Sequence, residues 1–298
     1  MLFKEFLALS DSDTAELVRR EGPRVVVFPI NGTRRWYYLE YGDGRVTTDH
    51  PDQAGFLDLI LDRYIDLFEL IFDHGISCLL SPILGPDIAA RDPDYLQMVR
   101  AALEEITGGE RFTTFYTRFD VRVRFYGDFD AFLEENAPAI PERIRRLQAA
   151  TADRVGHQLL WGMFAHDPVE KVAGLSIDHH RETGRIPRRE DLVTRYYGEY
   201  LPPADIFIGM LPPRVFDFPL LDIGKTALFF TTAPSPYLDR EMLRRILYEF
   251  IFNRPTEDAY ESQGSESWTA LDDFYRARRH ELIGAGRLAA GGRIWLPD

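Results

Sequence analysis

Apolar residues follow two patterns that alternate along the chain, and together they predict an α/β fold. Six short, nearly continuous apolar runs are typical of buried strands: they cover residues 25–30, 77–83, 121–126, 157–164, 204–209 and 228–232. Between them the apolar residues recur every three or four positions, as in helices that bury one face: these segments cover residues 56–72, 94–107, 141–152, 167–183, 191–200 and 239–252. Strands separated by helices favour a single, mainly parallel sheet flanked by helices.

Residues 1–253 are expected to form one domain, because no repeat and no linker interrupts the alternation. Residues 254–298 differ in composition, being polar and rich in glycine and arginine. We expect this C-terminal extension to wrap the surface or to act as a lid, and a passive tail is an equal alternative.

Composition narrows the class of protein further. The 298 residues carry a net charge of −13, which does not suit a duplex-binding surface, so no nucleic-acid partner is expected. Cys78 is the single cysteine and lies in an apolar run, which favours a buried small side chain. The first residues lack a basic segment followed by a long apolar one, and we expect a cytoplasmic protein.

The most informative chemistry lies directly after the first predicted strand, in Asn31-Gly32-Thr33-Arg34-Arg35-Trp36. Glycine lets an anion approach backbone N–H groups, and adjacent guanidinium groups can fork onto phosphate oxygens. Ligands of α/β sheets bind at the carboxyl ends of strands. The sequence therefore predicts an anion site here.

Three segments together resemble the cis-prenyltransferase family, whose fold is that of undecaprenyl diphosphate synthase. Residues 31–36 are similar to the family's Asp-Gly-Asn-Gly-Arg-Trp loop, and residues 121–128 to its central strand ending in Gly-Asp. The third segment is residues 204–231. Within the family, the chain most resembles the tuberculosinyl-adenosine transferase (tuberculosinol synthase) branch. That likeness includes the strings 126–128, 196–200, 216–221, 224–226 and 243–248.

The resemblance implies a terpenoid enzyme and a homodimer. In such an enzyme an allylic prenyl diphosphate ionises at its C–O bond with help from Arg34 and Arg35; a cyclic diterpenyl diphosphate is one candidate, and the sequence leaves chain length and cyclisation state open. The carbocation is then captured by water or by an acceptor such as a nucleoside. Chain elongation with isopentenyl diphosphate is not expected, because three of four positions of the family's second diphosphate site are changed. The four positions are Gly209, Arg214, Phe216 and Ala227, and Arg214 is retained.

Asn31 departs from the aspartate that the family carries and that helps to place Mg²⁺ on the diphosphate. An amide oxygen is a weaker ligand for this hard cation, so Mg²⁺ dependence is in doubt and no metal ligand is assigned. Three readings follow: ionisation driven mainly by arginines, replacement of the lost acid by Asp128, Asp217 or Glu40, or binding without turnover. The last would make the chain a non-catalytic binder or a partner subunit. A terpene synthase that ends in cyclisation or deprotonation is a further alternative.

The expected site follows from these points. The residues expected to act in catalysis are Asn31, Arg34, Arg35 and Asp217, the last as a general base toward water or an acceptor. Aromatic side chains are expected to line a tunnel for the isoprenoid tail and to stabilise a carbocation. The substrate-binding set is Gly32, Thr33, Trp36, Phe56, Tyr95, Phe125, Tyr126, Asp128 and Arg214. Arg240, Arg244 and Arg245 are expected on a solvated helix face or a dimer contact.

Overall fold

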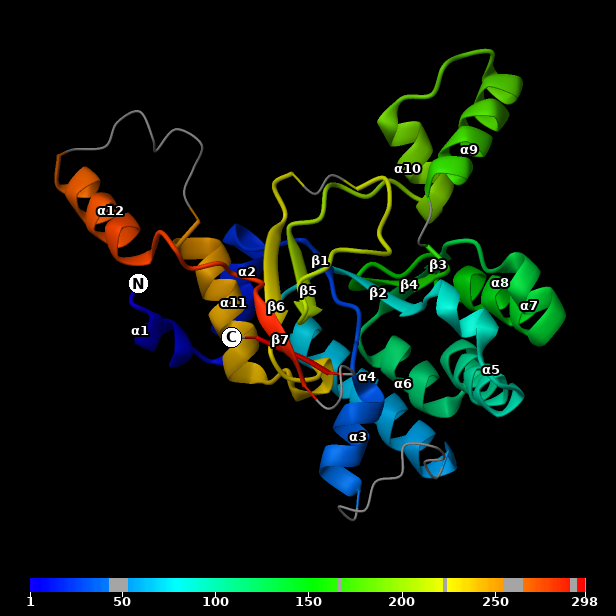
Figure 1. The fold of residues 1–298 in the computed structure, drawn as a ribbon. Coiled ribbons are helices and arrows are strands. Elements are labelled where there is room, and N and C mark those ends of the chain that lie inside the picture. The colour runs from blue at the N-terminus through cyan, green and yellow to red at the C-terminus, as the bar shows by residue number, and fades with distance from the viewer. Residues whose placement is uncertain (43–52, 166–167, 222–223, 255–264, 290–293, 298) are drawn as a thin grey trace.

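The computed structural model describes residues 1–42, 53–165, 168–221, 224–254, 265–289 and 294–297. Its centre is a six-stranded sheet in the order β3-β4-β2-β1-β5-β6, and every neighbouring pair is parallel (Figure 1). The strands are β1 (Val25–Val27), β2 (Cys78–Leu84), β3 (Val121–Tyr126), β4 (His157–Met163), β5 (Ile206–Met210) and β6 (Ala227–Thr231). The predicted fold class, a parallel sheet flanked by helices, is confirmed.

Apolar side chains project from both faces of the sheet and are buried on both. This explains why the strands appear in the sequence as nearly continuous apolar runs. In β1, Val26 packs into the larger core, whereas Val25 and Val27 pack into the smaller core on the opposite face. The strand ends earlier than expected because Pro29 has no N–H to continue the ladder. Phe28 still donates its N–H to the carbonyl of Leu80 at 2.9 Å.

Most helices cover one face of the sheet, where the larger core lies (Figure 1). The helices that contribute to this core are α1 (Phe3–Leu7), α2 (Asp11–Glu21), α4 (Gln53–Asp73), α5 (Pro93–Gly108), α6 (Glu110–Arg118), α7 (Asp130–Asn136), α8 (Ile140–Ala150) and α11 (Arg240–Phe252). The remaining helical segments of the body are α3 (Thr33–Tyr41) and two 3₁₀ turns, η1 (Pro86–Ala90) and η2 (Ser235–Tyr237).

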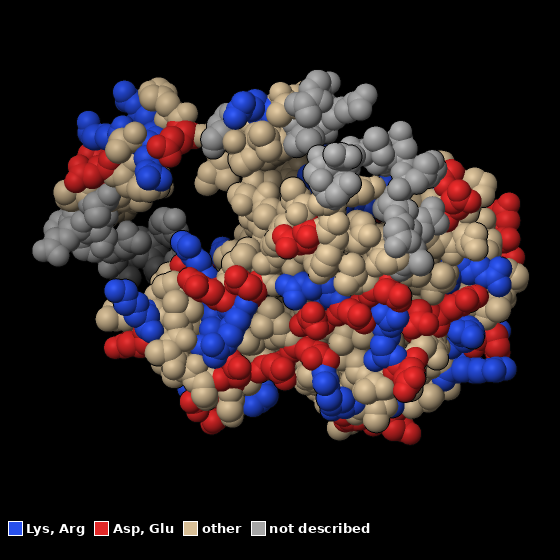
Figure 2. Space-filling model, turned by 90° about the horizontal axis from the view of Figure 1, so that it is seen from below, with Lys and Arg blue, Asp and Glu red and all other residues tan. Residues whose placement is uncertain are grey.

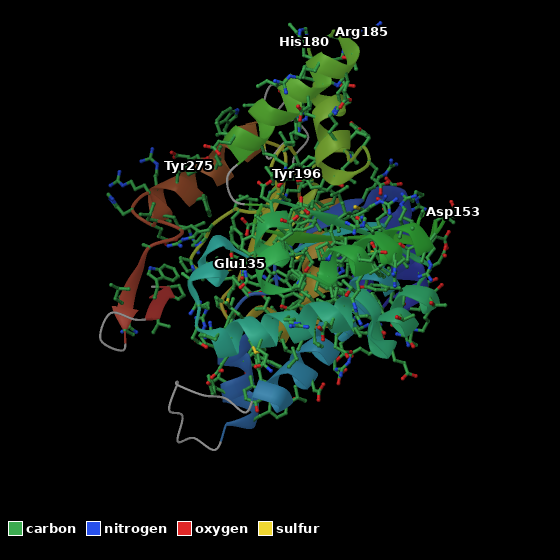
Figure 3. All side chains as sticks on the ribbon, turned by 90° about the vertical axis from the view of Figure 1, so that its right-hand side faces the viewer. Glu135, Asp153, His180, Arg185, Tyr196 and Tyr275 are labelled. Carbon is green, nitrogen blue, oxygen red and sulfur yellow. The ribbon has the colours of Figure 1, made fainter. Side chains whose placement is uncertain are left out.

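The other face is covered mainly by α10 (Arg189–Tyr197) and by the loops around the end of β5. Together with α9 (Pro168–Thr183), α10 forms an arm that extends from the body. Figure 3 places His180 and Arg185 at the tip of this arm and Tyr196 at its base. Beyond the body, the chain continues into α12 (Ser265–Arg278) and a two-stranded antiparallel ribbon of β7 (Gly286–Ala289) and β8 (Ile294–Pro297).

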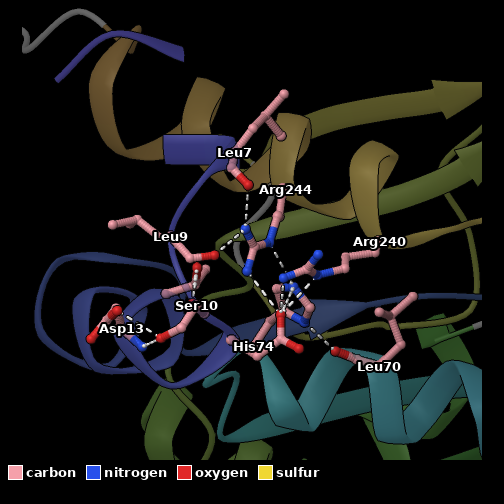
Figure 4. A network of polar contacts seen from close by, with 10 residues as sticks. Leu7, Leu9, Ser10, Asp13, Leu70, His74, Arg240 and Arg244 are labelled. Atoms are coloured by element: carbon pink, nitrogen blue, oxygen red, sulfur yellow. Dashed lines mark hydrogen bonds and ion pairs between the residues drawn. The ribbon is translucent and has the colours of Figure 1, made fainter. Parts of the chain in front are cut away.

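A buried arginine joins the two ends of the body, contrary to the expectation of a solvated helix face or a dimer contact. Arg244 of α11 is 1% exposed. Its guanidinium donates to the carbonyls of Leu7 and Leu9, each at 2.8 Å, to Asp11 at 2.8 Å and to Nε2 of His74 at 3.2 Å (Figure 4). The expectation was wrong for this residue because Arg244 lies on the side of α11 that faces α1 and the end of α4. That position buries the side chain despite its charge.

The surface shows no single basic field on the face drawn in Figure 2, where acidic and basic side chains alternate over neighbouring elements. None of the helices in the described ranges combines the length and the apolar content needed to cross a membrane.

Candidate active site

A cavity of about 830 Å³ opens at the carboxyl ends of β1, β2 and β5. Between β1 and β5 the direction in which the chain adds strands reverses, and such switch points are where α/β sheets bind ligands. Its wall is formed by Ile30, Asn31, Gly32, Thr33, Arg34, Phe56, Leu57, Ile60, Leu61, Tyr64, Pro82, Ile83, Leu84, Gly85, Ile88, Tyr95, Met98, Val99, Ala102, Leu103, Ile106, Arg214, Val215, Phe216 and Asp217.

One side of the mouth is the turn from β1 into α3. Gly32 adopts φ +75°, a left-handed conformation that favours glycine, and a Cβ there would lie 3.0 Å from Sδ of Met210. The first N–H groups of a helix have no partner within the helix, so the start of α3 presents donors to this side of the cavity. The turn is fixed by Asn31, whose N–H donates to Oγ of Ser235 at 3.0 Å and whose carbonyl accepts from the N–H of Ser235 at 2.9 Å.

The two predicted arginines separate at this point. Arg34 lines the cavity, and its guanidinium lies over the ring of Tyr95, 5.2 Å from the centroid. Arg91, which follows η1, lies 5.5 Å from the centroid of the same ring. Arg35 is outside the lining and directs Nη2 toward Sδ of Met210 at 3.7 Å. Of these two neighbouring arginines, Arg34 is therefore the one that the fold brings to the cavity.

The inner part of the cavity is apolar and is enclosed by α4 and α5. Phe56 and Ile60 of α4 are buried, and Val99, Leu103 and Ile106 of α5 form another part of the wall. Tyr64 of α4 brings a hydroxyl among these side chains, and its ring stacks on Trp161 with centroids 6.4 Å apart. Burial raises the pKa of Tyr64, which therefore stays neutral. Such a chamber suits a hydrocarbon tail.

The opposite side of the mouth is the segment from Arg214 to Asp217, which follows β5. Phe216 packs edge-on against Phe207 of the sheet, with ring centroids 5.9 Å apart. Asp217 adopts φ +62°, which an aspartate tolerates better than most residues. This wall therefore faces the α3 turn with an aromatic ring, a carboxylate residue and a guanidinium residue.

Several expected site residues lie behind the cavity wall. Trp36 is 7% exposed and packs with Phe56 and Ile60, so it fastens α3 to α4. Phe125 is buried in the larger core. Tyr126 is also buried and donates its hydroxyl to the backbone carbonyl of Asp217 at 2.8 Å.

Of the three acids that were considered as substitutes for the missing aspartate, only Asp217 lies at the cavity. Asp128 accepts from Nζ of Lys171 at 2.6 Å. Glu40 accepts from the hydroxyl of Tyr237 at 2.5 Å, which raises the pKa of that phenol to about 12. Neither Asp128 nor Glu40 lines the cavity, whereas Asp217 and Asn31 both do.

The donor set does not fit a metal cage built by the protein. Within the described ranges there is no group of three or more His, Cys, Asp or Glu residues placed to hold an ion. Mg²⁺ prefers six oxygen ligands and often takes several of them from water and substrate phosphates. Asn31 and Asp217 offer one amide oxygen and one carboxylate at the mouth.

Sequence reasoning missed the part of the site that depends on helix packing. Tyr64 and the α5 residues Met98 and Ala102 line the cavity but were not expected there, and Arg91 was not expected over the ring of Tyr95. The helical period of α4 and α5 marked their inward faces, but an inward apolar residue reads the same whether it meets the core or a cavity.

No family model matches the chain. The chain is 36% identical over 300 residues to the tuberculosinyl adenosine transferase of Mycobacterium tuberculosis (strain CDC 1551 / Oshkosh), a match that covers 99% of this chain and 98% of the relative. It is 24% identical over 284 residues to the (+)-kolavelool synthase of Herpetosiphon aurantiacus, covering 94% of this chain and 91% of that protein.

Solved structures share the fold at low identity. The lavandulyl diphosphate synthase of Lavandula x intermedia, determined in complex with dimethylallyl diphosphate, superposes with a TM-score of 0.63 at 16% identity and covers 78% of this chain and 97% of its own. A probable undecaprenyl diphosphate synthase from Campylobacter jejuni gives a TM-score of 0.54 at 15% identity over the same shares.

Proposed function

Because this chain belongs to the family of the tuberculosinyl adenosine transferase, within the cis-prenyltransferase fold, we propose that it ionises an allylic terpenyl diphosphate and transfers the allylic group to water or to a nucleoside. The observation that carries the proposal is the cavity itself. Arg34 and the start of α3 form its cationic mouth, and α4 and α5 form its apolar chamber. Mouth and chamber together have a volume of about 830 Å³. Ligand pockets commonly lie in this size range.

The reaction separates into two steps at this mouth. The C–O bond of the substrate breaks, and its electron pair leaves on a diphosphate oxygen, where Arg34 and the N–H groups of α3 stabilise the developing charge. The remaining allylic cation is then attacked by a lone pair of the acceptor. With water, the oxygen forms the new C–O bond and gives a proton to a base, for which Asp217 is our candidate. With a ring nitrogen, a C–N bond forms and the positive charge stays on the ring.

The residues of β5 and β6 at the positions of the family's second diphosphate site argue against binding of a second diphosphate. A Cβ at Gly209 would lie 2.7 Å from a ring carbon of Phe207 and 2.8 Å from Phe230, so an arginine has no room there. Ala227 is 3% exposed and offers no ligand. Transfer without elongation is therefore the activity that these positions support.

We propose that the guanidinium of Arg34 has the larger share in ionisation and that Arg35 acts from the edge of the mouth. The donor set does not fit a magnesium cage, so no step is assigned to a metal. Asn31 keeps one rival open, namely a protein that binds prenyl diphosphates without turnover.

One experiment separates these functions. Purified protein is incubated with geranyl, farnesyl, geranylgeranyl and a cyclic diterpenyl diphosphate, each with and without Mg²⁺ and adenosine, and released diphosphate is measured. We expect release from at least one of them, with an alcohol or an adenosine adduct as the organic product. Binding without release from any would favour the non-catalytic binder, and a purely cyclised or olefinic product would favour a terpene synthase.

A matched pair of variants ties the release to the site. Arg34→Gln is expected to abolish most of it, whereas Arg245→Gln removes an exposed guanidinium of α11 and is expected to change nothing. Equal rates in both variants would contradict the proposed role of the α3 turn.

We also propose that the protein is a homodimer acting in the cytoplasm, and light scattering at micromolar concentration tests the first point. For residues 254–298 we propose an extension that reaches the site, since a Cβ at Gly284 would lie 3.8 Å from Pro213, next to the cavity wall. Deletion of this extension is expected to raise the KM for the diphosphate.

A further inference from the structure

Two buried tyrosines from different elements hold the turn at Asp217–Pro219, next to the Phe216–Asp217 wall of the cavity. Tyr126, at the end of β3, donates its hydroxyl to the backbone carbonyl of Asp217 at 2.8 Å. Tyr197, near the end of α10, donates its hydroxyl to the carbonyl of Pro219 at 2.5 Å. Both side chains are 1% exposed, and their ring centroids lie 4.9 Å apart.

The turn needs this support because it bends against backbone preference. Asp217 and Leu220 both have positive φ, +62° and +68°, in a conformation that costs about 1–2 kcal/mol per non-glycine residue. Between them Phe218 enters the smaller core and stacks on Phe207, with centroids 5.6 Å apart. The two hydroxyls thus fix the carbonyls on either side of an inserted ring.

The sheet makes room for one of these tyrosines by means of a glycine. A Cβ at Gly162 of β4 would lie 2.5 Å from Oη and 2.6 Å from Cζ of Tyr126. The phenol therefore crosses the neighbouring strand directly over Gly162. Burial raises the pKa of both phenols well above its ordinary value, so both remain donors across the working range of pH.

We propose that Tyr126 and Tyr197 are positioning residues for capture of the allylic cation, because their hydroxyls hold the Phe216–Asp217 wall where the acceptor meets the reacting carbon. The inference rests on the proposed function. Neither tyrosine lines the cavity, so both act through the turn. A wall that shifts leaves the α3 turn unchanged, and so affects the fate of the cation more than its formation.

The test uses hydroxyl deletions that keep the rings: Tyr126→Phe, Tyr197→Phe and the double variant. The control is Tyr116→Phe, which removes another buried hydroxyl: it donates to the backbone carbonyl of Ile106 at 3.1 Å and also accepts from Nε1 of Trp161 at 3.2 Å. Each protein is given adenosine and the diphosphate that the wild type releases fastest. Released diphosphate and the ratio of captured product (alcohol plus adenosine adduct) to olefin are measured together.

We expect each single variant to release diphosphate within about threefold of the wild type while its ratio of captured product to olefin falls about tenfold, the effect of one buried hydrogen bond. The control is expected to keep the wild-type ratio. Because the tyrosines lie on different elements, failure of one variant to fold leaves the other to decide.

Three results would overturn the inference. An unchanged ratio in the folded variants would do so, as would an equal change in the Tyr116 control. Loss of release at a constant ratio would indicate a structural role alone. If the wild type releases no diphosphate from any substrate, the proposed function fails as well, which distinguishes that outcome from failure of the inference alone.

Discussion

Replacing Arg244 by methionine is expected to destabilise the body more than any other single arginine change on α11. Methionine keeps most of the length and apolar volume of the side chain but removes every donor. The carbonyls of Leu7 and Leu9 lose donors that lie at 2.8 Å, and His74 loses the donor at its Nε2. The partner carboxylate of Asp11 is 55% exposed, so water replaces much of that ion pair.

The magnitude follows from these groups. Leaving a buried polar group without its partner costs about 1–3 kcal/mol, and three such groups lose a donor here, the carbonyls of Leu7 and Leu9 and Nε2 of His74, so a total of about 3–5 kcal/mol is expected. The entropy of unfolding is about 2.1 cal/mol/K per residue, which for this length is roughly 0.6 kcal/mol/K. The expected fall in Tm is therefore about 5–8 °C.

The assay is thermal unfolding followed by far-ultraviolet circular dichroism, with a urea titration of the same samples. The control is Arg245→Met, which removes the neighbouring but exposed guanidinium and is expected to shift Tm by about 1 °C or less. If the two variants unfold within about 2 °C of each other, the contribution assigned to the buried cluster is wrong.

Four further outcomes are expected. Asn31→Asp should make diphosphate release depend strongly on Mg²⁺, because it adds a carboxylate at the mouth; equal Mg²⁺ titrations for it and the wild type would count against a metal role for this position. Arg34→Met should lower kcat by about 10²–10³, the usual effect of removing one group that stabilises developing charge, and a loss under threefold would contradict its assignment. Gly32→Ala should cost about 1–2 kcal/mol, since alanine is strained at φ +75°, and an unchanged urea midpoint would refute this reason. Burial lowers the pKa of His74 in the folded protein, so the unfolded state binds its proton first and stability should fall as pH drops below about 6.5; the urea midpoint at pH 5.5 should then lie below that at pH 7.5, and His74→Gln should reduce the difference.

The order and type of the main elements were accessible from the sequence because parallel strands and one-sided helices leave different apolar periods. The strand 121–126 was predicted at its observed bounds, and in the structure Arg122 and Arg124 alternate with buried Val121 and Val123. The short helix α3, Thr33–Tyr41, was missed because its first residues were assigned to an anion-binding loop after the first strand.

The site was predictable only where chemistry marks it. Asn31, Gly32 and Arg34 reach the cavity because they lie a few residues beyond the end of β1, a position that the apolar run of the sequence reveals. Phe125 and Tyr126 were expected beside them, but they lie on β3, at the edge of the sheet. Phe125 is buried in the larger core, and Tyr126 contacts the Asp217 wall of the cavity from behind. Which of two neighbouring arginines, Arg244 or Arg245, is buried depends on packing across the whole chain.

The buried Arg244 has a consequence for how the protein is made. Arg244 and its acceptor Leu9 are separated by 235 residues. At about 5–20 residues per second, a ribosome needs roughly 12–47 s to synthesise that stretch. Throughout this interval α1 and the turn into α2 have been made, yet their last partner does not exist. The first eleven residues of the chain are therefore among the last to be locked in place, and a chaperone or protease that acts on the nascent chain meets them before the fold can protect them.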